Sequence, residues 1–189
     1  GGHLGFSREE LTHLYEPDYE ANYDDEIRRI IACVHEYGEK YGVHIPVITA
    51  GGIMNARQVQ HAFALGAEGV QVATPFVTTE ECDADVAFKQ AYVDAKPGDA
   101  VIVKSPVGMP GRALNNNFIA NIVPEGCKIK RCFNCLTHCD PKTIPYCISQ
   151  ALFNGANGDI DHGLIFCGAN VEKVDKITTV HEIFEELTK

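Results

Sequence analysis

A short apolar run that ends in two consecutive glycines constrains the fold of this chain more than any other feature. The β-branched residues at 45–50 predict a buried strand, and Gly51 and Gly52 follow it directly. Asn55 then stands where it can cap a helix with apolar residues at helical spacing. A second short strand is expected at 69–73. Strand, helix and strand at this spacing predict a parallel βαβ unit.

Other segments predict helices, strands and loops less strongly. Asp24 and Asp25 predict the start of a helix that Gly38 or Gly42 closes, and Thr79 predicts the start of another helix. The remaining expectations are a strand at 100–104, a Pro- and Gly-rich loop at 105–112, a helix at 148–154, a buried strand at 164–168 and a terminal helix from 178. Two strong parallel strands and one weaker strand are too few for an eight-stranded barrel, which takes roughly 200 residues at least. We therefore expect either an open sheet or a part of a longer chain.

Charge and hydropathy argue against several classes of partner. The chain has 16 Lys and Arg against 26 Asp and Glu, and the net charge of −10 repels nucleic-acid phosphates and anionic lipid. No apolar run approaches the roughly 18 residues that span a bilayer, and no basic-then-apolar leader stands at the start. We expect a cytoplasmic protein that acts on a small molecule and binds neither nucleic acid nor membrane. Its eight cysteines are then reduced thiols or metal ligands.

The Gly51–Gly52 turn is a candidate phosphate site. Glycines between a strand and a helix let an anion approach the backbone N–H groups at the helix N-terminus. About twenty residues later, Ala73 and Thr74 end the next strand and could complete a clamp, as in the late strands of (β/α)₈ enzymes. The alternative is a tight strand-to-helix turn without a ligand.

Five segments follow one another in an order that is far more specific than any one of them: GGHLG at 1–5, PVITAGGI at 46–53, AFALGAEGVQ at 62–71, TTEEC at 78–82 and SPVGMPGRAL at 105–114. The series resembles the later half of the nitronate monooxygenase family, formerly called 2-nitropropane dioxygenases. The flavin-dependent enoyl-acyl-carrier-protein reductases are close relatives of that family.

The resemblance implies an α/β fold, the C-terminal portion of a (β/α)₈ TIM barrel with a small, mainly helical inserted subdomain. Residues 1–95 would form a partial barrel segment with the phosphate-binding turns. Residues 96–157 would form the substrate-side, cysteine-rich insertion, and residues 158–189 the return to the barrel. Members carry roughly half of the barrel before the glycine-glycine-histidine motif. The chain is therefore expected to be a fragment that pairs with another copy as a homo-oligomer or is inactive alone.

The resemblance also implies FMN as a non-covalent cofactor. His3 matches the histidine credited with deprotonating the nitroalkane, and an imidazole suits that role near neutral pH. The other matched positions are Gly1 and Gly2 along the flavin, Gly51 and Gly52 in the phosphate loop, Ala73 and Thr74 in place of a glycine–threonine pair, and Ser105 and Met109 in the segment over the flavin ring near the substrate. Pro75 replaces a common arginine, and Ala73 adds a methyl group, so the second half of the clamp departs from the family pattern.

Three functions stay open from the sequence. The first is an FMN-dependent nitronate monooxygenase that oxidises nitronates or nitroalkanes with dioxygen. The second is a flavin-dependent enoyl-acyl-carrier-protein reductase that uses NAD(P)H. The third is an inactive fragment that associates with itself or binds a metal.

A cysteine-rich segment stands apart from the resemblance. Cys132, Cys135, Cys139 and Cys147 follow the spacing C-x₂-C-x₃-C-x₇-C. Thiolates at such gaps suit an iron–sulfur cluster, and zinc with His138 as a further ligand is the second option. The spacing loosely resembles the cluster motif of iron–sulfur flavoenzymes that reduce dienoyl thioesters. A set of reduced cysteines in a small helical subdomain is the alternative.

Overall fold

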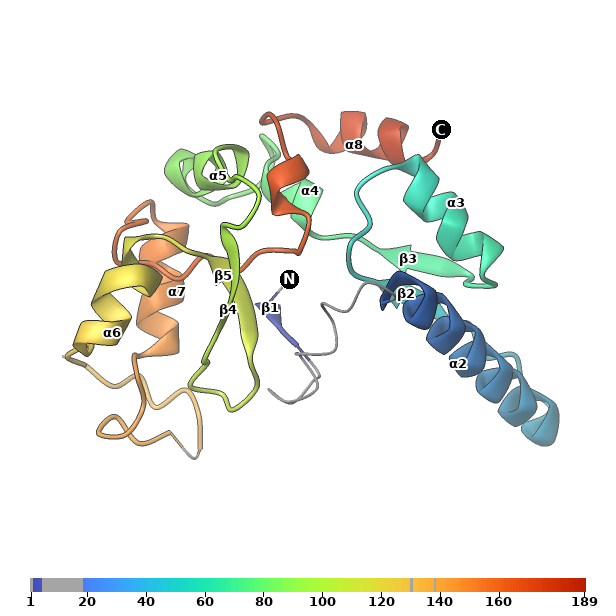
Figure 1. The fold of residues 1–189 in the computed structure, drawn as a ribbon, viewed down its shortest axis with the longest axis horizontal. Coiled ribbons are helices and arrows are strands. Elements are labelled where there is room, and N and C mark those ends of the chain that lie inside the picture. Colours follow the sequence, from blue (N-terminus) through green and yellow to red (C-terminus); the bar gives the residue numbers. More distant parts are fainter. Residues whose placement is uncertain (1, 5–18, 130, 138) are drawn as a thin grey trace. The chain divides into compact units, whose positions relative to one another are not determined.

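Figure 1 shows the computed structural model of the chain, which describes residues 2–4, 19–129, 131–137 and 139–189. The chain divides into two units. The larger unit holds residues 2–4 and 73–180, and the smaller unit holds residues 19–72 and 181–189. None of the described helices is long and apolar enough to cross a membrane.

The smaller unit contains the predicted parallel strand pair. Strand β2 (Ile48–Ala50) pairs with β3 (Gly69–Gln71) in parallel, with Ile48 opposite Gly69. Helix α3 (Ala56–Ala64) connects them, with Asn55 as its N-cap. The predicted βαβ unit is confirmed, and Figure 1 shows the strand pair between α3 and the long helix α2.

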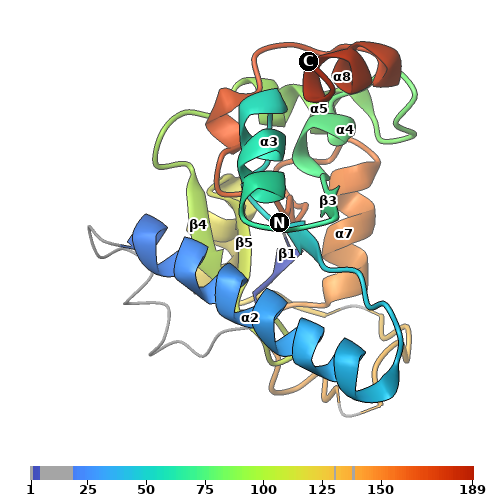
Figure 2. The ribbon, with the colours of Figure 1, turned by 90° about the vertical axis from the view of Figure 1, so that its right-hand side faces the viewer.

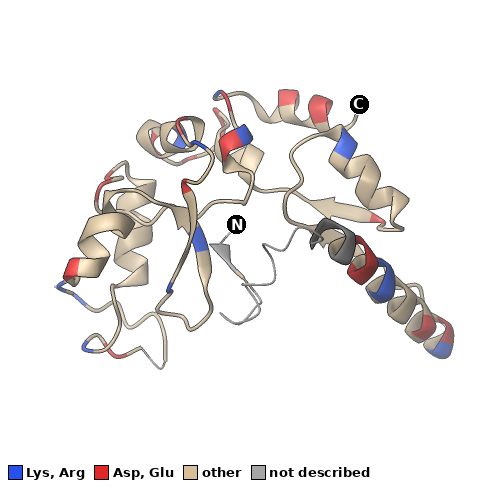
Figure 3. Ribbon diagram, in the orientation of Figure 1, with Lys and Arg blue, Asp and Glu red and all other residues tan. Residues whose placement is uncertain are grey.

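Helix α2 spans Tyr19–Tyr41, so the predicted start at Asp24 is wrong. Asp24 does not cap the helix; its carboxylate lies 3.0 Å from Nε2 of His61 on α3. Both expected glycines take part in the helix end. Gly42 has a φ of 64°, and the N–H of Val43 donates to the carbonyl of Gly38 at 3.0 Å. Acidic and basic residues alternate along the described part of the helix (Figure 3).

The sheet of the larger unit is antiparallel, with strand order β1–β5–β4 (Figure 2). Its strands are β1 (Gly2–His3), β4 (Ala100–Val103) and β5 (Gly111–Leu114). Strand β4 was predicted, whereas β5 was expected to be loop up to Arg112. A side chain at Gly111 would place its Cβ 2.6 Å from the ring of Phe166, so this strand needs a glycine where it passes the ring.

Helix α5 (Val86–Val93) begins seven residues after the predicted start at Thr79. The hydroxyls of Thr78 and Thr79 donate to carbonyls of the preceding turn at 3.1 and 2.9 Å, and both side chains are buried. Such local hydrogen bonds compete with helix formation. Asp85 caps α5 instead, and its carboxylate accepts from the N–H of Ala87 at 2.8 Å.

Two apolar clusters form the core of the larger unit. In the first, Ile148 and Ala151 of helix α7 (Ile148–Ala156) pack with Val103 and Ala113 of the sheet. The second surrounds Ile165. The expected strand at 164–168 is buried as predicted, but it joins β5 only through the bridge between Phe166 and Ala113.

The remaining elements are short, apart from the terminal helix. They are α4 (Thr74–Val77), the π-helix η1 (Phe118–Ile122), α6 (Val123–Glu125), the 3₁₀ helix η2 (Val171–Lys173) and α8 (Val180–Leu187). The expected helices at 148–154 and from 178 are confirmed by α7 and α8, and α4 was not anticipated.

Candidate functional site

The Gly51–Gly52 turn has the backbone conformation that the phosphate hypothesis requires. Gly51 has a φ of 99° and Gly52 a φ of 71°, in the left-handed region that favours glycine. Both residues are exposed, and no atom lies within 4 Å of the position that a Cβ would take on Gly51. The turn therefore presents open space at the carboxyl end of β2.

Helix α3 begins four residues after this turn, with two reciprocal side-chain contacts. The Asn55 carboxamide accepts from the N–H of Gln58 at 3.1 Å, and the Gln58 carboxamide accepts from the N–H of Met54 at 2.7 Å. These contacts fix the start of the helix, whose positive dipole end favours an anion. The glycine turn and the positive end of the helix dipole fit the phosphate of an FMN molecule, since no atom fills the space beside Gly51.

Ala73 and Thr74 do not end the second strand as predicted, because β3 stops at Gln71; they lie at the start of α4, in the larger unit. Ala73 is the N-cap residue and is exposed. The hydroxyl of Thr74 lies against the backbone of Gly168, where an added Cβ would come within 2.4 Å of Oγ1. Because Gly51 and Gly52 belong to the smaller unit, the predicted two-part clamp stays a prediction.

Strand β1 brings together two motifs that lie far apart in the sequence. Gly2 pairs with Arg112 and His3 with Gly111, and the N–H of Leu4 donates to the carbonyl of Pro110 at 2.8 Å. The backbone of His3 therefore runs beside the end of the 105–112 segment. Gly1 lies outside the described residues.

Within this segment the two predicted substrate-side residues differ in exposure. Ser105 is only 5% exposed, and its hydroxyl and carbonyl accept from the N–H groups of Val107 and Gly108 at 3.4 and 3.2 Å. Ser105 thus holds the turn. Met109 is 49% exposed and is open to a ligand.

Arg112 is a candidate that the sequence reasoning did not single out. It lies on β5 opposite Gly2, and the positive charge of its guanidinium favours the ionised form of the Cys167 thiol. Burial raises the pKa of Cys167 to about 11, while the positive charge of Arg112 opposes the rise. The position of Arg112 at the end of the SPVGMPGR motif was the available signal.

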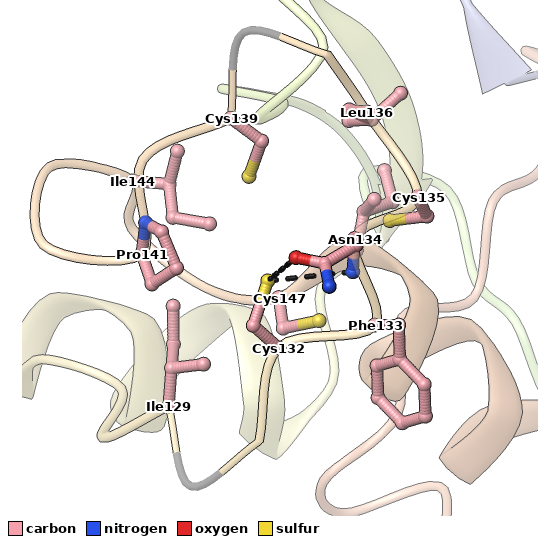
Figure 4. Close-up of a pocket in the computed structure, with 11 residues that line it drawn as sticks. Ile129, Cys132, Phe133, Asn134, Cys135, Leu136, Cys139, Pro141, Ile144 and Cys147 are labelled. Carbon is pink, nitrogen blue, oxygen red and sulfur yellow. Dashed lines mark hydrogen bonds between the residues drawn. The ribbon is translucent and has the colours of Figure 1, made fainter.

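The four cysteines of the spacing motif line one small cavity of about 30 Å³. Figure 4 shows Cys132, Cys135 and Cys139 on the loop and Cys147 where the chain enters α7. The rest of the lining is mostly apolar, with Ile129, Phe133, Leu136, Pro141, Ile144 and Ile148 around the sulfurs.

Two of these sulfur atoms accept hydrogen bonds. Sγ of Cys132 accepts from the N–H of Asn134 at 3.4 Å, and Sγ of Cys135 accepts from the hydroxyl of Ser149 at 3.1 Å. Desolvation raises the pKa of Cys139, and the charges of the thiolates at 132, 135 and 147 raise it further. In the described part of the chain, no three His, Cys, Asp or Glu side chains are arranged to hold a metal ion. His138 lies outside that part.

Comparisons with known proteins agree with these motifs. The family model for nitronate monooxygenase matches residues 1–189, the whole chain. A probable nitronate monooxygenase of Staphylococcus aureus strain Newman is 46% identical over 77 residues, which cover 41% of this chain and 22% of the relative. The corresponding protein of strain JH9 is 44% identical over the same length.

Solved structures with a similar fold include two enzymes of known type. FabK from Thermotoga maritima is 31% identical, with a TM-score of 0.60 over 77% of this chain and 43% of that chain. A nitroalkane oxidase from Streptomyces ansochromogenes is 22% identical, with a TM-score of 0.62 over 99% of this chain and 47% of that one. The chain thus spans less than half the length of these relatives. With the α/β fold and the match along its full length, the chain belongs to the nitronate monooxygenase family of oxidoreductases.

Proposed function

We propose that this chain is part of an FMN-dependent oxidoreductase that oxidises nitronates or nitroalkanes with dioxygen. The observation that carries the proposal is the family match along all 189 residues. The pairing of β1 with β5 supports it, because the histidine motif and the SPVGMPGR segment, two motifs of one enzyme family, lie side by side.

The residues of the chain have separate roles in this proposal. The backbone at Gly51 and Gly52 would bind the FMN phosphate, and the Asn55 cap would keep the start of α3 oriented toward it. Gly1, Gly2, Ala73 and Thr74 are the further proposed cofactor contacts. When bound, FMN supplies the electron transfer that no amino-acid side chain provides.

His3 would take the proton from the carbon that carries the nitro group. An imidazole, with an unperturbed pKa of about 6.5, is a suitable general base near neutral pH. Ser105 would keep the substrate-side turn in shape, and Met109 would offer an apolar surface to the alkyl part of the substrate.

The second candidate function is that of an enoyl-acyl-carrier-protein reductase. FabK is a reductase of this kind, and it is 31% identical over 77% of this chain. Anaerobic stopped-flow mixing of the FMN-loaded protein with either reductant distinguishes the two. Rapid flavin bleaching by a nitronate, with little bleaching by NADH or NADPH, is the expected result. Rapid bleaching by NAD(P)H alone would assign the reductase function instead.

We also propose that β2 and β3 belong to a TIM barrel that is completed outside this chain. The similar structures are more than twice as long as the part that matches. As the chain stands, residues 1–95 and 158–189 would supply barrel segments, and residues 96–157 would form the insertion. We expect a homo-oligomer in which another copy of the chain covers the barrel segments, and light scattering would measure this oligomeric state. A monomer that binds FMN would contradict this expectation.

A further inference from the structure

The segment around the cysteines is an unusually long stretch without regular structure. Between the end of α6 at Glu125 and the start of α7 at Ile148, the described residues form no helix or strand. Loops longer than about 12–15 residues without secondary structure are uncommon in compact domains, and they are usually functional or disordered. This loop lies next to a packed core, since Tyr146 is buried and its hydroxyl donates to the carbonyl of Lys104 at 3.1 Å.

Four thiols face one cavity in this loop, although they are spread over sixteen positions of the sequence. All four are free cysteines. Three come from the loop, and Cys147 is the N-cap residue of α7, so the helix anchors one of the four. Packing alone does not explain the arrangement, because Cys132 and Cys135 are exposed rather than used as small core residues.

The chemistry of the lining points to a metal that prefers sulfur. The lining contains four cysteines and no carboxylate or imidazole. Soft thiolate ligands select iron–sulfur clusters, zinc and copper(I), whereas magnesium and calcium prefer oxygen.

The number and kind of ligands fit a cluster. Four sulfurs from four cysteines surround the same cavity. A single zinc ion requires its sulfur ligands within about 2.3 Å of one point. A [4Fe–4S] cluster occupies the centre with its own atoms, and each of its iron atoms takes one thiolate from a different side.

We propose that Cys132, Cys135, Cys139 and Cys147 ligate one [4Fe–4S] cluster. Each thiol loses its proton when it binds iron, and no electron transfer is needed for assembly from iron(II), iron(III) and sulfide in the cluster's own oxidation state. The N–H of Asn134 and the hydroxyl of Ser149 would remain as hydrogen-bond donors to two of the ligand sulfurs. Such bonds contribute to the reduction potential of a cluster. The proposal does not depend on flavin binding.

Anaerobic reconstitution of the whole chain with iron salts and sulfide tests the proposal. Metal and acid-labile sulfide analysis should give about four iron and about four sulfide per chain. The reduced sample should give the paramagnetic resonance signal of a half-integer-spin cluster. One zinc per chain without sulfide, or no bound metal at all, would overturn the proposal.

Two further measurements identify the ligands. Cys135→Ser should lose most of the bound iron. Cys33→Ser, at a thiol on α2 that is also exposed, and Cys127→Ser, at a thiol that lies before the motif and packs on the core, should retain it. Alkylation of the unsubstituted, cluster-loaded chain, read by peptide mass, should protect Cys132, Cys135, Cys139 and Cys147 and leave Cys33 reactive. Iron retained in Cys135→Ser, or alkylation of the four motif cysteines in the loaded chain, would refute the assignment.

Discussion

The substitution Gly51→Ala separates the backbone cost of the glycine turn from its proposed role in phosphate binding. Gly51 has a φ of 99°, and the new methyl group would meet no atom within 4 Å. The folded protein therefore suffers only backbone strain, about 1–2 kcal/mol for an L-residue in the left-handed region. The expected fall in melting temperature is about 2–4 °C for each kcal/mol in a chain of this size.

Gly42→Ala is the matched control in the same unit. Gly42 has a φ of 64° and equally open surroundings, but it ends α2 instead of preceding a helix N-terminus. Both variants should lose similar stability. Only Gly51→Ala should weaken FMN binding, because the altered turn misdirects donors to a charged phosphate, each worth about 1.5–3 kcal/mol or roughly 10–150-fold in Kd.

The assay is titration of the apo-protein with FMN, followed by quenching of flavin fluorescence, beside thermal unfolding monitored by circular dichroism. If both variants bind FMN as tightly as the unsubstituted chain, or if both lose affinity equally, the turn does not hold the phosphate.

Three other predictions concern stability. Gly163→Ala should destabilise the chain by about 1–3 kcal/mol in denaturant unfolding, because its Cβ would lie 2.4 Å from the backbone of Gly155; wild-type stability would contradict that close packing. Asn55→Ala should cost about 1 kcal/mol, because the N–H of Gln58 loses its side-chain acceptor, and an unchanged midpoint would count against the cap. Burial raises the pKa of Tyr146 from 10.0 to about 12, so the folded state holds its proton longer than the unfolded state, and stability falls with rising pH between these values. Tyr146→Phe should make that fall shallower by up to about 1.4 kcal/mol per pH unit, and identical slopes would refute the assignment.

The sequence predicted the parts of the fold whose local signals agree with their tertiary contacts. The strand at β2, the glycine turn and the Asn55 cap each follow from residues within a few positions of one another. Parallel pairing with β3 then follows from the spacing. The same reasoning applies to α7 and α8, whose apolar residues recur at helical intervals.

The errors arose where distant residues decide the local structure. Strand β5 follows a segment rich in Pro and Gly and is ordered by pairing with β1 and β4 on both of its edges. The backbone of Thr78 and Thr79 pairs with that of Thr178, far along the chain, and the next helix begins only at Val86. At the candidate site, the family resemblance implied that Ser105 lies near the substrate, and this stays a prediction; Ser105 is buried, and its hydroxyl accepts from the N–H of Val107.

The pairing of β1 with β5 has a consequence for how the chain acquires its structure. His3 and Gly111 are partners, although 108 positions separate them in the sequence. A ribosome that adds 5–20 residues per second needs about 5–20 s to synthesise the chain between them. During that interval, the β2–α3–β3 unit can already form from neighbouring residues, while β1 still lacks β5, the strand with which it pairs. The backbone of His3 therefore becomes ordered late in biosynthesis, only after strands β4 and β5 have been synthesised.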